Sequence, residues 1–167
     1  MKKTTTFIFL LMMATSLLAN NISVTNASLS GQNTSAGVND AANYTMIKFD
    51  ISWEHTWRIS THNITGDAAW IFVKYRVGSG VWKHATLSTS DFVEPSGSTI
   101  TPTADGIGAF MYRSMDGTGS NNWIDAKLRW NYGVDGVYDN DVIDIHVYAI
   151  EMVYVSGGGF YSGYRRN

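Results

Sequence analysis

Residues 46–53 alternate strictly between apolar and polar side chains, and this pattern constrains the fold more than any other part of the sequence. A period of two is that of a β-strand with one buried face. The apolar set is Ile47, Phe49, Ile51 and Trp53. No stretch beyond residue 20 keeps a helical period, and sixteen glycines with only two prolines indicate short strands joined by tight turns. The chain is therefore expected to be all-β.

Two hairpins are predicted from the spacing of apolar runs and turn residues. The strongest strand is residues 68–77, and the Gly78-Ser79-Gly80 turn leads from it into a second strand over residues 81–87. Residues 107–113 and 123–130 form the second predicted hairpin, joined by a loop over residues 116–122.

The remaining segments complete the expected fold. Residues 88–105 are rich in Ser, Thr, Pro and Gly, which predicts a loop with one short strand at 99–101. Residues 142–155 are predicted as one long or bulged closing strand. We expect a single antiparallel β-sandwich of about seven to nine strands, with jelly-roll and immunoglobulin-like topologies both open.

The first twenty residues are predicted to be a secretory signal peptide. Lys2 and Lys3 precede an apolar core over residues 7–18, which is shorter than a membrane span. An uncleaved membrane anchor is the alternative, and it lacks a following basic stop-transfer cluster. Residues 21–155 are then the β-sandwich domain and residues 156–167 a Gly/Tyr/Arg tail. After cleavage no integral membrane span is expected.

The composition limits the cellular compartments and the binding partners expected for this chain. The chain has no cysteine, so it can hold no disulfide, no thiolate metal site and no cysteine nucleophile. An exported chain without cysteine fits a bacterial envelope protein that is secreted, at the cell surface or in the periplasm. Twelve basic and fourteen acidic residues give a formal charge of −2, which argues against nucleic acid as a partner.

Several motifs resemble a known but uncharacterised module. The runs DAAWIFVKYRV, LRWNYGVDGV and IDIHVYAIEMVYVSGGGFYSG are similar to an N-terminal β module of exported Bacteroidetes-type proteins. In those proteins the module commonly precedes a domain similar to the formylglycine-generating, sulfatase-modifying enzymes. The sequence ends at Asn167 and lacks the cysteine nucleophile of those enzymes. The resemblance thus implies a module, and one alternative role is that of an accessory domain.

No catalytic residue is assigned, and the chain is expected not to be an enzyme. The four histidines show no i, i+4 metalloprotease spacing, and no G-x-S-x-G elbow or phosphate-binding glycine loop is present.

A calcium site is one hypothesis for the acidic segment 135–141. Asp135, Asp139 and Asp141 could offer carboxylates on one loop, but the spacing is not that of an EF-hand. Ordinary turn chemistry is the alternative, and no other cofactor is expected.

A carbohydrate site is a second hypothesis. Trp57, Trp82 and Trp123 lie at strand ends or beside glycine turns, where rings are more often exposed and could stack on a polysaccharide. The other three tryptophans, Trp53, Trp70 and Trp130, are predicted to be core.

A third hypothesis concerns residues 21–29, which alternate well enough to form a strand but carry little apolar mass. Such a strand could pair with another subunit or another envelope protein, and the alternative is that it simply completes its own sheet. Its proposed pairing residues are Ile22, Val24, Asn26 and Ser28. The leading expectation is an exported, non-catalytic structural or interaction module that self-assembles by strand exchange at the cell surface, with carbohydrate binding as the main alternative.

Overall fold

The computed structural model describes residues 21–61 and 65–153. The predicted signal peptide, residues 1–20, and the predicted tail, residues 156–167, lie outside the described residues. The described part contains nine antiparallel β-strands and no helix. The strands are β1 (Ser23–Asn33), β2 (Tyr44–Ile59), β3 (Thr65–Val77), β4 (Lys83–His84), β5 (Leu87–Val93), β6 (Ser98–Pro102), β7 (Gly108–Arg113), β8 (Gly117–Trp130) and β9 (Ile143–Val153).

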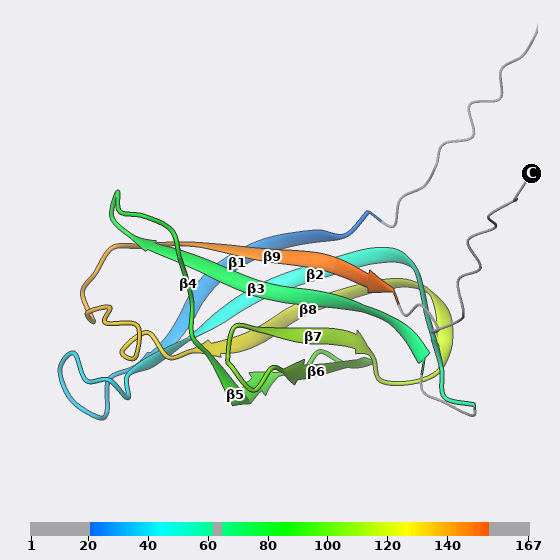
Figure 1. Cartoon of the computed structure of the whole chain (residues 1–167), viewed down its shortest axis with the longest axis horizontal. Coiled ribbons are helices and arrows are strands. Elements are labelled where there is room, and N and C mark those ends of the chain that lie inside the picture. Colours follow the sequence, from blue (N-terminus) through cyan, green and yellow to red (C-terminus); the bar gives the residue numbers. More distant parts are fainter. Residues whose placement is uncertain (1–20, 62–64, 154–167) are drawn as a thin grey trace, which may run out of the picture.

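All nine strands belong to one hydrogen-bonded sheet that folds over on itself (Figure 1). The first layer has the order β1-β2-β8-β5, and the second has the order β9-β3-β7-β6. β4 lies beside β7 along the same edge of β3. The layers stay joined at the β2–β3 hairpin, where Arg58 pairs with Gly66. β1 contacts β9, and β5 contacts β6, so the sandwich is nearly a barrel.

The core lies between the two layers and confirms the alternation predicted for residues 46–53. Ile47, Phe49, Ile51 and Trp53 of β2 are at most 1% exposed. From the second layer, β3 contributes Ile71 and Val73 as their counterparts. Fully burying an apolar side chain of this size contributes about 1.5–3 kcal/mol. This repeated contribution allows a chain without disulfides to hold two layers together.

The second predicted hairpin is wrong. β7 pairs with β3 and β6, whereas β8 pairs with β2 and β5. The predicted loop over residues 116–122 is instead the first half of β8, because its backbone pairs with the far end of β2, where Thr56 is opposite Gly119. In the predicted loop over residues 88–105, the expected short strand at 99–101 is confirmed as β6, but most of β5 also lies there and was not predicted.

The other strand predictions hold in outline. Residues 68–77 lie within β3, residues 143–153 form the closing strand β9, and residues 23–29 begin β1. The hairpin after Gly80 exists, but β4 is only two residues long and Leu87 already starts β5 in the other layer. The chain passes between layers five times: from β2 to β3, from β4 to β5, from β5 to β6, from β7 to β8 and from β8 to β9.

Candidate functional site: an aromatic sheet face

The outer surface of the second layer is built from aromatic side chains. Along β3 the core takes Ala69, Ile71 and Val73, so Trp70 and Phe72 project to the opposite side of the sheet. In the ladders, Trp70 is opposite both Ile150 of β9 and Phe110 of β7, and Phe72 is opposite Tyr148 of β9. We call this surface the aromatic face and define it by the rings of Trp70, Phe72, Trp82, Phe110, His146 and Tyr148.

Four rings of the aromatic face, Phe72, Tyr148, His146 and Trp82, contact one another in a continuous series. Phe72 stacks on Tyr148 with centroids 5.0 Å apart and planes 9° from parallel. Tyr148 is 6.0 Å from His146, and His146 packs edge-on at 4.5 Å against Trp82. On the other side of Phe72, the His84 ring lies 5.7 Å away. Such pairs are worth about 0.5–1.5 kcal/mol beyond the area that they bury, so the rings hold one another in place.

Trp82 reaches across the width of β3. It comes directly before β4, on the β7 side of β3, yet its ring contacts His146 on β9 at the opposite side. The guanidinium carbon of Arg76, a β3 residue, lies 4.9 Å from the centroid of this ring. A cation over an indole is attracted to its electron-rich face. Trp82 therefore lies over β3 and continues the aromatic face toward the Gly78–Gly80 turn.

Trp70 lies against the backbone of β7 because Gly108 has no side chain. A Cβ built on Gly108 would come within 2.6 Å of the Trp70 ring and 2.5 Å of the Ile71 carbonyl oxygen. The indole fills this space and also contacts Phe110, with centroids 4.8 Å apart. The glycine thus lets a large ring lie close to the sheet.

One end of this surface is apolar as well as aromatic. Tyr148, Ile150 and Met152 of β9 are 41%, 51% and 47% exposed. Adjacent exposed apolar side chains on one sheet face mark a place where another molecule binds more often than scattered ones do.

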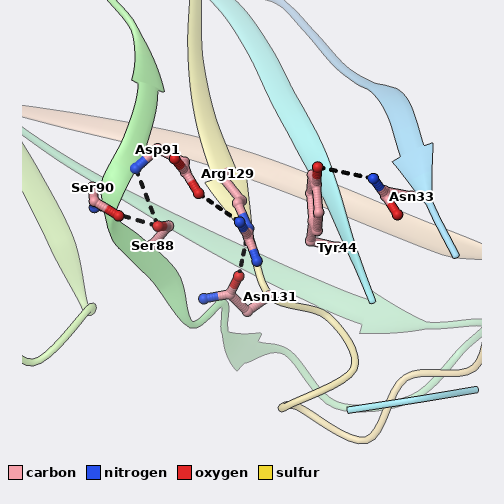
Figure 2. Close-up of polar contacts among 7 residues, drawn as sticks. All are labelled: Asn33, Tyr44, Ser88, Ser90, Asp91, Arg129 and Asn131. Carbon is pink, nitrogen blue, oxygen red and sulfur yellow. Dashed lines mark hydrogen bonds and ion pairs between the residues drawn. The ribbon is translucent and has the colours of Figure 1, made fainter. Parts of the chain in front are cut away.

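Around Arg129, the outer surface of the first layer is held by polar contacts and carries no series of touching aromatic rings among the described residues. Arg129 of β8 lies over the ring of Tyr44 at 3.8 Å and is paired with Asp91 of β5 (Figure 2). The Arg129 side chain also donates to Asn131, and the Tyr44 hydroxyl accepts from Asn33. The polar groups of this part of the first layer therefore bond to one another.

The three tryptophans predicted for carbohydrate binding are not brought together. Trp82 belongs to the aromatic face. Trp57 lines an open hollow at the β2–β8 end with Glu54, His55 and Thr118. The expectation that Trp123 is exposed is wrong: it is 7% exposed and packs edge-on against Trp53, with centroids 5.0 Å apart.

Sequence reasoning also misplaced Trp70. Trp53 and Trp130 are core as predicted, but Trp70 lies on the outer surface. Both sides of β3 are apolar, so burial could be assigned to either side from the sequence. The signal that could have separated them is the register, because Trp70 falls on the same side as Lys74 and Arg76.

The three aspartates of the calcium hypothesis make separate contacts. Asp135 accepts from the Thr86 hydroxyl and backbone and from the Trp130 indole. Asp141 accepts from the backbone N–H of Tyr138. Within the described ranges no group of three acidic or histidine side chains is arranged to hold a metal ion.

Asp139 ties the 131–142 segment to the segment that precedes β2. Its carboxylate accepts from the backbone N–H of Asn39, the Tyr132 hydroxyl and the Asn43 amide. These bonds, the one from Asn39 first, lower the pKa of Asp139 below its ordinary value. Asp139 and Asp141 also line a cavity of about 290 Å³ beside the end of β1.

The predicted assembly strand pairs within its own chain in this structure. Val24 is opposite Ile51, and Ile22 and Val24 pack against the core. Asn26 has a positive φ of 54° at a bulge, and its side chain donates to Asp50. Ser28 is exposed opposite Lys48. In the described residues β1 has a ladder partner on one edge only.

Comparison of the chain with protein-family models, with curated proteins and with solved structures found no match. Among the described residues, no helix has the length and apolar character needed to cross a membrane.

Proposed function

We propose that this chain is an exported, non-catalytic binding module whose aromatic face takes up carbohydrate. The single observation that carries the proposal is the series of touching rings on one outer sheet surface, from Trp82 through His146 and Tyr148 to Phe72. The apolar sides of pyranose rings stack on aromatic rings, and a row of rings on a sheet offers successive sugar units a place to lie.

The arrangement of the rings favours binding energetically. An aromatic side chain supplies a large contact area with few rotatable bonds, so little conformational entropy is lost on binding. Here the rings already pack against one another, which further reduces the cost of ordering them.

Polar groups at the rim supply directional bonds to sugar hydroxyls. Arg76 and His84 offer donors, and Asp144 offers acceptors, beside the rings of Trp82 and Phe72. An apolar surface with a few placed polar groups is the usual composition of a ligand site.

Assembly through β1 is a second candidate, favoured by the ladder-free outer edge of that strand. The bulge at Asn26 interrupts β1, and bulges of this kind protect edge strands from pairing with other chains. We therefore place it behind carbohydrate binding. Deletion of residues 21–30, followed by native mass measurement, tests it: an unchanged oligomer would exclude β1 as the assembly element.

The test of the carbohydrate proposal is retention on immobilised or gel-embedded polysaccharides. We expect Trp70→Ala and Tyr148→Ala to lose retention while the melting temperature stays close to that of the unmodified chain. Tyr44→Ala is the matched control, because Tyr44 is a half-buried aromatic residue on the outer surface of the other layer. The proposal fails if no polysaccharide of a broad panel is retained, or if Tyr44→Ala reduces retention as much as Trp70→Ala.

A further inference from the structure

Three side chains that can carry positive charge lie in a row across the aromatic face. In the β3 ladders Lys74 is opposite His84 of β4 on one side and opposite His146 of β9 on the other. Directly opposite residues of antiparallel strands project to the same side of the sheet. The contacts of His84 with Phe72 and of His146 with Trp82 place both imidazoles among the rings.

This row has little negative charge around it. Among the described strand positions of this outer surface the one carboxylate is Asp144, and Arg76 already holds it with bonds of 2.8 and 2.7 Å. Lys74 forms no ion pair within the described part of the chain. On the polar outer surface of the first layer, by contrast, Lys48 is paired with Asp125.

We propose that the ligand of the aromatic face is an acidic polysaccharide, with its negative group held over Lys74 between His84 and His146. This inference rests on the carbohydrate-binding function proposed above. The negative group is a uronate carboxylate or a sulfate ester, since both present several acceptor oxygens to the ammonium donors of Lys74. The adjacent sugar units lie on the rings of Phe72 and Tyr148.

Charge complementarity favours this occupant over a neutral glycan. Lys74 has no ion pair in the described part of the chain, so a bound anion supplies the partner that the protein does not. Aromatic neighbours exclude part of the water around the row, which strengthens the attraction to an anion. Binding is accordingly expected to weaken as salt concentration rises, because salt screens partly exposed charges.

The experiment compares two forms of one polymer. Polygalacturonate and its fully methyl-esterified form share a backbone but differ in charge, so each probe isolates one part of the proposal. We expect the unmodified chain to bind the acidic form at least about tenfold more tightly, as the loss of one charge-assisted bond would give. A sulfated galactan in place of polygalacturonate distinguishes sulfate from carboxylate as the negative group.

The variants separate the contribution of the Lys74 charge from that of the aromatic rings. Lys74→Gln is expected to lower affinity for the acidic polymer about tenfold and to leave affinity for the esterified polymer unchanged. Lys127→Gln is the matched control, because Lys127 is a half-buried lysine of β8 with no ion pair in the described residues. Trp70→Ala is expected to weaken binding of both polymers.

Each outcome decides a different claim. Equal affinity for acidic and esterified polymers, with loss of both in Trp70→Ala, would overturn the acidic ligand and leave carbohydrate binding standing. No binding to any neutral or acidic polymer would overturn the proposed function itself. A dimer in native mass measurements that Trp70→Ala dissociates would show that a second copy covers the aromatic face, which also overturns the inference.

Discussion

The carboxylate of Asp67 accepts a hydrogen bond from the indole N–H of Trp53 at 2.8 Å, although both side chains are almost completely buried. The second carboxylate oxygen of Asp67 accepts from the backbone N–H of Trp57, also at 2.8 Å. Since Asp67 belongs to β3 and Trp53 to β2, these bonds connect the two layers close to the hairpin that joins them. At the other end of the sandwich, the indole N–H of Trp130 donates a hydrogen bond to the carboxylate of Asp135 in the same way.

Asp67→Ala is expected to destabilise the fold by about 2–3 kcal/mol, because a hydrogen bond to a charged acceptor is lost and the buried Trp53 N–H is left without a partner. Urea unfolding measures the change. Asp91→Ala is the control, since its exposed ion pair with Arg129 should be worth under about 1 kcal/mol. Equal losses in the two variants would contradict this account of Asp67.

Gly108→Ala is expected to destabilise the second layer by about 1–3 kcal/mol, the usual cost of forcing extra atoms into a packed site. The added carbon would meet the Ile71 carbonyl oxygen and the Trp70 ring. Near-ultraviolet circular dichroism should report the displaced indole. If the spectrum and the urea midpoint both stay unchanged, Gly108 is not what seats Trp70.

Acid is expected to destabilise the protein through its surface carboxylates. The Asn26 amide and then the Asp125 backbone N–H lower the pKa of Asp50, and Asn39 lowers that of Asp139. The unfolded chain therefore binds protons first, so stability is fully present above the unfolded-state pKa of about 3.9 and is lost as pH falls through the lower folded-state pKa values. Melting temperatures should fall mainly below a pH of about 4, and less steeply in Asp139→Asn. Parallel curves for the two proteins would contradict the role of Asp139.

Calcium is expected to leave the melting temperature unchanged relative to a chelator. A calcium ion needs six to eight oxygen ligands, and the carboxylates of Asp135 and Asp139 already accept protein hydrogen bonds. Thermal unfolding in both buffers provides the measurement. A rise of several degrees in calcium that Asp141→Asn abolishes would instead support the calcium hypothesis.

The strands were predictable where only one of their faces is apolar. The alternation over residues 46–53 identified both the strand and its buried side, and Ile47 and Phe49 are fully buried as expected. The first half of β8 was not predictable, because the segment around Gly117 and Gly119 is rich in residues that usually form turns. Pairing with β2 supplies their backbone hydrogen bonds, and that pairing lies far away in the sequence.

The candidate site was predictable only in part, since Trp82 was selected but its neighbours were not. Phe72 and Tyr148 belong to strands some seventy residues apart in the numbering, and their contact depends on the β3–β9 register. No local pattern encodes a register between distant strands. The row of His84, Lys74 and His146 was missed for the same reason, because each of the three comes from a different strand.

The pairing of β2 with β8 also has a consequence for how quickly the chain reaches its native state. The ladder joins Thr45 to Trp130, so the first layer is incomplete until most of the chain is available. Folds dominated by such distant pairings reach the native state slowly, on the order of milliseconds to seconds. During that interval the apolar side of β2 has no cover, and a dilute, cool refolding buffer should therefore give a higher yield of native protein than a concentrated, warm one.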